Sequence, residues 1–425
     1  MAPVLNTLRH MANLRSSRNS ECSNPRVPPT VEVFDPDGDM LLLVGKQICA
    51  GTCCNSAQNK QPNAVCFRVN SVIIAGASPA FGFVLYSPSA ANVTGNRVEW
   101  TVRLPDDDPQ AMHTMINILY GHYPVNISDE HVDLEQLLNL TILADKYDLV
   151  HHLADWTVPW VQDMETYWVG RKFVGKSTED LESLLWISWV LGHEPLYTCM
   201  ILQIAFHSEL DASGKLTDPT EQLCFTNEFR EVPVPPYAPI EIGHTRIEVL
   251  KMIRRNIKVT LEEHLHGKRK SSWLRCRRPD GADDSAWRQS ILVAFVEMLE
   301  AEGIWPLPSA YMLTASPKSL VEIFRVNPSI PSFTHRHDSR FCEPESTFWE
   351  RIEKLLCEVR YTLPPQSAIH LSEQAAKSGL ASYFKSRGLG MGLEKGNWNM
   401  REILEFQEAS AEDNMPEGSR IPTHS

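Results

Sequence analysis

The chain has 425 residues, a net charge of −13 and 43% hydrophobic residues. Because single hydrophobic cores stop growing at about 250–300 residues, we expect two or three domains. The composition matches that of average globular proteins, which excludes collagen-like, low-complexity and wholly disordered chains. No run of 18 apolar residues and no apolar signal segment at the start is present, so we expect no membrane association and an intracellular location, in the nucleus, the cytoplasm or both.

Residues 1–29 show no apolar periodicity and contain arginines, serines and prolines, with no acidic residue before Glu21. We expect a disordered tail there, and an import presequence stays open as the alternative. The region 30–162 mixes strand and helix patterns and is expected to form one domain. Alternating or unbroken apolar residues predict four strands, at 31–33, 40–44, 65–70 and 98–103.

Helices are expected between and after these strands. Asp108 and Pro109 predict the start of one helix, which Gly121 closes. The helix over 134–149 is apolar nearly all round and should therefore be central. The other helices of this domain are expected at 72–77, 81–86 and 151–161, and the polar segment 46–64 is expected to be a loop.

Beyond residue 162 the pattern changes to helices alone. We expect a helical region over 163–409 and a disordered tail over 410–425. Proline-rich connectors separate the expected helices, and no fixed-period repeat indicates a solenoid. The expected helices cover 179–191, 195–210, 244–266, 285–302, 317–325, 346–359 and 399–409.

Several short stretches occur in the order found in BTB/POZ domains, and the N-terminal half resembles that family. The most specific of them is Leu143–Leu149, which contains Ala-Asp-Lys-Tyr. A looser similarity links the rest of the chain to the helical C-terminal regions of filamentous-fungal BTB proteins, through Ile187–Gly192 and Gly303–Pro308. The remaining stretches that carry the resemblance are Gly38–Val44, Phe67–Val69, Ala77–Phe81, Val102–Pro109 and Asn117–Gly121.

The resemblance implies an α+β BTB/POZ fold, in which helical hairpins flank a small sheet. It also implies a non-enzymatic protein-interaction scaffold that forms a homodimer and binds further, unidentified protein partners. Val31, Val33 and Asp39 are the interaction residues it suggests. The core residues it suggests are Phe67, Phe81, Leu137, Leu140, Ala144 and Tyr147.

Two departures from the family bear on partners. Asn70 and Gly76 stand where a basic stretch is usual, so Asp39 would lack its basic partner in a dimer. No acidic residue lies between Phe81 and Glu99, where adaptors of cullin-type ubiquitin ligases often carry an apolar-x-Glu motif. A cullin is therefore disfavoured as a partner, although the adaptor function stays open.

Charge is distributed unevenly along the chain. Residues 30–160 contain 15 acidic and 6 basic side chains, which disfavours nucleic acid as a partner of the N-terminal half. Residues 246–278 contain 11 basic and 3 acidic side chains. An amphipathic helix with a solvated basic face explains the first part of this segment. The loop cluster Lys268, Arg269 and Lys270 is a candidate nuclear-import signal, which keeps a nuclear or chromatin regulator open.

We expect no enzyme and no cofactor, because no nucleotide-binding glycine motif, nucleophile elbow or His-Glu-x-x-His motif occurs. The run Asp106, Asp107 and Asp108 is expected to be a solvated helix cap, since consecutive carboxylates point apart rather than converging on a metal.

Ten cysteines are scattered over the sequence, and with no secretory signal we expect reduced thiols. His335, His337 and Cys342 with Cys276 are candidate zinc ligands, because imidazoles and thiolates suit tetrahedral zinc. The alternative is that these side chains lie in a solvated loop and bind no metal. The hypothesis of a metal-dependent enzyme in the helical half would require the zinc site. A second set has a spacing unusual for zinc and is expected to hold free thiols: Cys49, Cys53, Cys54 and Cys66.

Overall fold

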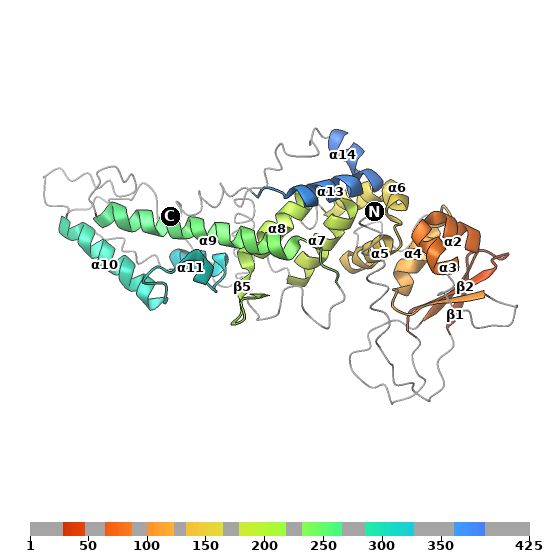
Figure 1. Ribbon diagram of the computed structural model, residues 1–425, viewed down its shortest axis with the longest axis horizontal. Helices are drawn as coiled ribbons and strands as arrows, with labels where there is room; N and C mark the ends of the chain where they lie inside the picture. The colour runs from red at the N-terminus through yellow and green to blue at the C-terminus, as the bar shows by residue number, and fades with distance from the viewer. Residues whose placement is uncertain are drawn as a thin grey trace, which may run out of the picture. The chain divides into compact units, whose positions relative to one another are not determined.

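The computed structural model describes residues 29–46, 64–86, 100–122, 133–164, 178–217, 232–265, 285–326 and 361–386. These stretches combine a small sheet with many helices, so the chain has the predicted α+β class (Figure 1). They form two compact units. The first contains the described residues up to Met164, the short stretch Val190–His193 and the described residues from His370 onward, and the second contains the others.

A four-stranded sheet with the order β1-β3-β2-β4 lies in the first unit. β2 and β3 are antiparallel, β1 is parallel to β3 and β4 is parallel to β2, so β1 and β4 form the edges. The strands lie close to their predicted positions: β1 is Thr30–Val33, β2 is Met40–Val44, β3 is Val65–Val69 and β4 is Trp100–Leu104.

The helices α2 (Ser71–Ala77) and α3 (Pro79–Tyr86) follow β3 as a hairpin. Polar side chains cap both helices. The amide oxygen of Asn70 accepts the backbone N–H of Val72, and the hydroxyl of Ser78 accepts that of Phe81. These bonds satisfy N–H groups that the first turn of a helix leaves without a helical partner.

The next helix, α4 (Pro109–Leu119), begins as predicted, because the Asp108 carboxylate accepts the Ala111 N–H at 2.7 Å. The prediction that the whole acidic run is solvated is wrong for Asp107. Its side chain is buried, since Lys146 and Tyr147 donate hydrogen bonds to it from the end of the following helix.

That following helix, α5 (Leu134–Lys146), is central in the first unit, as its apolar pattern predicts. The predicted burial of the six core residues is confirmed, since none of them is more than 1% exposed. The rings of Phe81 and Tyr147 stack with their centroids 4.2 Å apart, which ties the helical hairpin to the end of α5. The six residues are Phe67, Phe81, Leu137, Leu140, Ala144 and Tyr147.

α5 ends at Lys146, earlier than the predicted residue 149. Asp148 has a φ of +51°, and the Leu149 N–H donates back to the Ala144 carbonyl at 2.7 Å. This left-handed reversal ends the helix, and aspartate tolerates it better than most residues. The predicted helix at 151–161 is a 3₁₀ turn, η2 (Val150–Leu153), followed by α6 (Ala154–Met164).

Two helices near the end of the described chain were not predicted, α13 (Pro365–Lys377) and α14 (Leu380–Ser386). Their residues from His370 onward belong to the first unit. The buried positions of α13 repeat at helical spacing, but most of them are small or polar and give no apolar stripe in the sequence. They are Ser367, Leu371, Gln374, Ala375 and Ser378 at the end of the helix.

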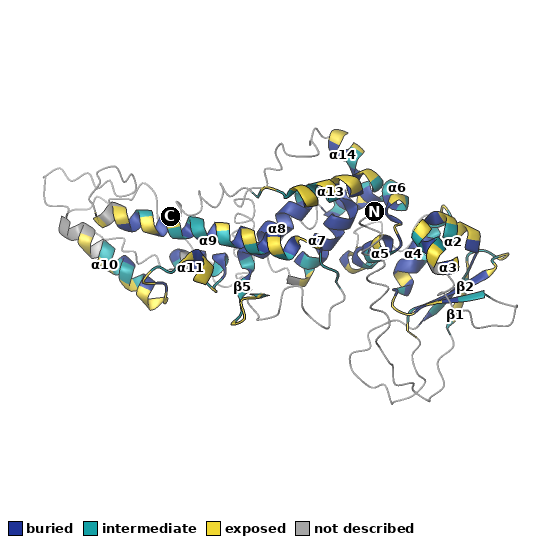
Figure 2. Cartoon of the chain, viewed as in Figure 1, coloured by how far each residue is buried: buried dark blue, intermediate teal, exposed yellow. Residues whose placement is uncertain are grey.

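The second unit is built mainly from helices. α8 is buried on nearly every side, which explains why its sequence is mostly apolar, with Thr198 and Gln203 as buried polar exceptions (Figure 2). The predicted helices at 346–359 and 399–409 lie outside the described residues. The described helices are α7 (Thr178–Leu191), α8 (Glu194–His207), α9 (Ala238–Leu265), α10 (Ser285–Ala301) and α11 (Pro317–Val326), with a 3₁₀ turn, η5 (Ala310–Met312).

Two predicted boundaries in this unit are corrected. α8 ends at His207 rather than at residue 210, because β5 (Glu209–Leu210) pairs with β6 (Leu216–Thr217). α9 begins at Ala238 rather than at residue 244.

A buried arginine crosslinks this unit. Arg246 donates hydrogen bonds to the backbone carbonyls of Ser208, Leu313, Thr314 and Ala315, at 2.8–2.9 Å. Burial lowers the pKa of Arg246 to about 10, so the guanidinium is still charged at neutral pH. Four carbonyl dipoles compensate for its loss of hydration.

Candidate interaction surface

The edge strand β1 presents its apolar side chains to solvent. Val31 and Val33 are each 56% exposed, whereas Glu32 between them is partly buried, with 42% of its side chain exposed. Strands normally turn valines toward the core and carboxylates toward water, because burying a charge is costly. β1 therefore has inverted polarity, and the structure shows which contacts hold Glu32 inward.

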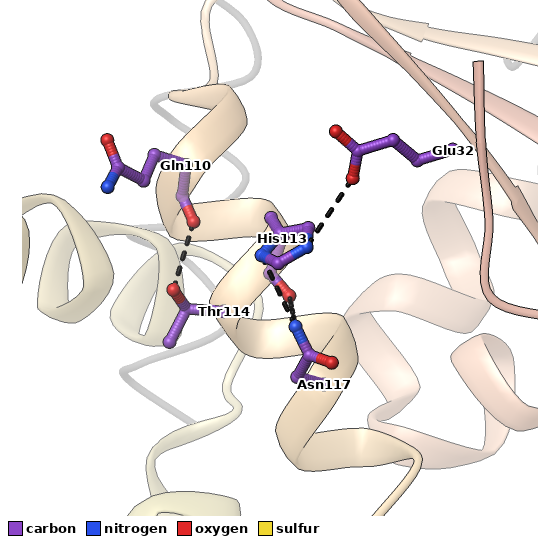
Figure 3. A network of polar contacts seen from close by, with 5 residues as sticks. All are labelled: Glu32, Gln110, His113, Thr114 and Asn117. Carbon is purple, nitrogen blue, oxygen red and sulfur yellow. Dashed lines mark hydrogen bonds and ion pairs between the residues drawn. The ribbon is translucent and has the colours of Figure 1, made fainter. Parts of the chain in front are cut away.

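The partner of Glu32 is His113 on α4 (Figure 3). The imidazole Nε2 lies 3.4 Å from the Glu32 carboxylate, and Nδ1 lies 3.2 Å from the Asn117 amide nitrogen. The amide also donates to the His113 carbonyl at 3.0 Å. If the amide N–H points at Nδ1, that nitrogen is an acceptor and the ring hydrogen on Nε2 points at Glu32. The network fixes the imidazole and, through it, the orientation of β1.

Phe34 strengthens the same orientation. Side chains two residues apart on a strand share a face, so Phe34 follows Glu32 toward α4. Its ring centroid is 5.3 Å from that of His113 and 5.9 Å from that of Phe67. The aromatic contacts anchor the end of β1, and Val31 and Val33 are left on the opposite face of the sheet.

That opposite face is apolar. Val31 pairs with Cys66 on β3, and Cys66 pairs with Leu43 on β2, so the three side chains share one side of the sheet. Leu43 and Cys66 are buried, and Leu41 packs against them. The exposed valines thus extend an apolar sheet face to its edge, where an unpaired strand can add a further strand.

A second set of exposed apolar side chains lies on the α2–α3 hairpin. Val72 is the most exposed of them at 72%. The set spans both helices, and the Tyr86 hydroxyl lies 3.3 Å from the Ser71 hydroxyl, where the end of α3 meets the start of α2. Exposed apolar residues that gather on one element indicate a contact surface more strongly than isolated ones. The set comprises Val72, Ile73, Phe83 and Tyr86.

Asp39, the third predicted interaction residue, has a partner within its own unit. Its carboxylate accepts the Ser71 backbone N–H at 2.8 Å and the Ser71 hydroxyl at 2.7 Å. The Ser71 N–H is the main cause of the lowered pKa of Asp39. Sequence reasoning looked for a basic partner, whereas the structure shows that this carboxylate caps the first turn of α2.

The second unit contains a buried carboxylate that the sequence did not single out. Glu241, in the first turn of α9, is 5% exposed and accepts hydrogen bonds from three hydroxyl groups. These come from Tyr197 at 2.8 Å, Tyr361 at 2.6 Å and Ser367 at 2.5 Å. Burial and the Glu241 charge raise the pKa of both tyrosines, so they remain donors at neutral pH. This arrangement is suited to anchoring the segment 361–367.

Several predicted sites lie outside the described residues. These are the zinc candidates Cys276, His335, His337 and Cys342, and the basic cluster Lys268, Arg269 and Lys270. The segment 87–96, which bears on cullin binding, also lies outside them. Of the second cysteine set only Cys66 is described, and its side chain is buried on β3.

Comparisons with known proteins found no family model, no curated protein and no solved structure that matches this chain. Among the described residues no three His, Cys, Asp or Glu side chains are grouped to hold a metal ion. None of the described helices is both long and apolar enough to span a membrane.

Proposed function

We propose that the first unit is a non-enzymatic protein-interaction module of the BTB/POZ type, which pairs with a second copy of the chain through β1. The observation that carries the proposal is the inverted polarity of β1. Val31 and Val33 face solvent while Glu32 is held by His113. Exposing the apolar side chains of such an edge strand to water costs free energy in a monomer, and covering them with a partner strand is favourable.

The arrangement of elements supports the BTB/POZ type. A β2–β3 hairpin is followed by the α2–α3 helical hairpin, and β4 then pairs with β2 in parallel before α4 and α5. The most specific stretch of the resemblance, Leu143–Leu149, supplies two of the contacts that bury Asp107. A small sheet flanked by helical hairpins is what the resemblance implies.

Light scattering of the full chain tests self-association. At tens of micromolar we expect twice the monomer mass of 48.1 kDa. Val31→Lys combined with Val33→Lys should give the monomer mass, because lysines on an edge strand oppose strand addition. Thr30→Lys is the matched control and should leave the dimer intact. Thr30 is also exposed on β1, but it lies on the other face of the strand from Val31 and Val33.

Two results would contradict the proposal. The first is a monomeric parent at this concentration, and the second is a double variant that keeps the dimer mass. A circular dichroism spectrum equal to that of the parent must show that the double variant is folded. Sub-micromolar binding to a cullin N-terminal domain would instead favour the adaptor function.

A further inference from the structure

Residues 370–386 pack against other parts of the first unit from a distant place in the sequence. Lys377 Nζ donates to the Asp148 carboxylate at 2.8 Å, across a separation of 229 residues. The Ser378 hydroxyl donates to the Leu191 carbonyl at 2.6 Å. The second bond satisfies a carbonyl at the end of α7 that the helix itself leaves without a partner.

Two glycines allow an unusually close approach. A Cβ added to Gly192 would lie 2.1 Å from the Ala375 nitrogen and 2.4 Å from the Leu371 carbonyl oxygen. A Cβ on Gly379 would lie 3.1 Å from the Ala154 carbonyl oxygen. The backbone of α13 therefore rests directly on Gly192, and the turn before α14 rests on the first residue of α6.

Apolar side chains complete the contact. Leu371, Leu380 and Phe384 are buried, and α14 packs against α6. The Phe384 ring meets the buried His193 ring edge to face, with centroids 5.1 Å apart. The segment 370–386 thus covers a surface formed by Asp148, α6 and residues 190–193.

We propose that residues 370–386 act as a clasp, which covers this surface when docked and uncovers it when released. The clasp is short, and the ion pair between Lys377 and Asp148 is solvent-exposed and contributes little. The clasp packs through small residues that let two backbones approach closely, and a slight displacement would lose these packing contacts. Under this proposal the clasp opens before the rest of the first unit, and this regulatory device does not depend on self-association through β1.

Hydrogen exchange of the full chain tests the clasp. Gly192→Ala should speed amide exchange in 370–386 and in α6 at least about tenfold, and leave β3 protected. The matched control is Gly121→Ala. Gly121 has nearly the same φ, +73° against +76°, but no atom lies within 4 Å of an added Cβ. The control should leave exchange in 370–386 unchanged, which separates steric displacement of the clasp from backbone strain.

An engineered disulfide provides the reverse test. The Cβ built on Gly379 lies 3.4 Å from the Ala154 Cβ, close to the range that a disulfide spans. Ala154→Cys with Gly379→Cys should crosslink on oxidation, and exchange in 370–386 should then fall to the level of β3. The proposal is overturned if exchange in 370–386 stays unchanged once the crosslink has formed, or if Gly192→Ala speeds exchange in β3 as much as in 370–386.

Discussion

Tyr147 donates its hydroxyl to the buried carboxylate of Asp107 at 2.5 Å. Lys146 Nζ reaches the other carboxylate oxygen at the same distance. Burial and the Asp107 charge raise the pKa of Tyr147 well above its usual value, so the phenol stays a donor. A neutral donor and a cation thus satisfy one carboxylate, and this joins the end of α5 to the loop before α4.

The hydroxyl of Tyr147 should therefore contribute measurably to stability. Tyr147→Phe keeps the ring that stacks on Phe81 but leaves a buried acceptor with one donor fewer, so we expect a loss of about 1–3 kcal/mol in urea denaturation. Tyr86→Phe is the control, because Tyr86 is exposed and its hydroxyl makes a longer contact of 3.3 Å with the Ser71 hydroxyl, so the loss of stability should stay within about 0.5 kcal/mol. Equal effects of the two changes would show that the Asp107 contact does not stabilise the fold.

The center of α5 should not tolerate a charge. Ala144 is fully buried, so Ala144→Asp places an unpaired carboxylate in the core and should cost more than about 4 kcal/mol. Asn139→Asp adds the same charge at a half-buried position of the same helix and should cost far less. Thermal denaturation of the two variants measures the difference. A melting temperature for Ala144→Asp within a degree of the parent would contradict the assigned core.

Hydroxyl groups around Glu241 should hold the segment 361–367 in the second unit. Tyr361→Phe and Ser367→Ala each remove one donor from a buried carboxylate, and each should cost about 1.5–3 kcal/mol. Faster amide exchange in residues 361–367 should accompany the loss. Tyr237→Phe, at an exposed tyrosine just before α9, serves as the control and should change neither quantity. Unchanged exchange in the first two variants would mean that Glu241 does not anchor this segment.

Protonation of His207 should destabilise the second unit in mild acid. Burial, and then the Lys318 charge, lower the pKa of His207 to about 4, and its Nδ1 lies 2.8 Å from the Gln203 carbonyl oxygen. In the unfolded chain the pKa is about 6.5, so between these values the unfolded state binds more protons. Stability is therefore complete above about pH 6.5 and falls as the pH drops toward 4.

The size of this effect can be isolated by substitution. Between pH 7 and pH 5 the parent should lose about 1–2 kcal/mol more than His207→Gln in urea denaturation, since the variant lacks the titrating group. Other histidines titrate equally in both proteins, so the difference reports His207 alone. The same pH dependence in parent and variant would show that His207 is not held neutral by the fold.

The sequence by itself determined the elements whose signals are local. Asp108 with Pro109 predicted the start of α4, because a cap acts within one turn. The near-continuous apolar pattern of residues 134–149 predicted a central helix, and the burial of Ala144 and Leu140 followed from it. Short-range bonding and hydrophobic periodicity sufficed here, since both depend on residues close together in the chain.

The tertiary structure decided the features that depend on partners far away in the sequence. Glu32 lies on the α4 side of the sheet because its carboxylate pairs with His113 on α4. Asp107 can be buried because Lys146 and Tyr147 donate hydrogen bonds to its carboxylate. The helix α13 has too few apolar residues to be predicted, because it packs by close backbone approach to Gly192 rather than through large side chains. A sequence pattern records what a residue contributes locally, whereas the free energy of burying a charge or a small residue depends on what the fold places against it.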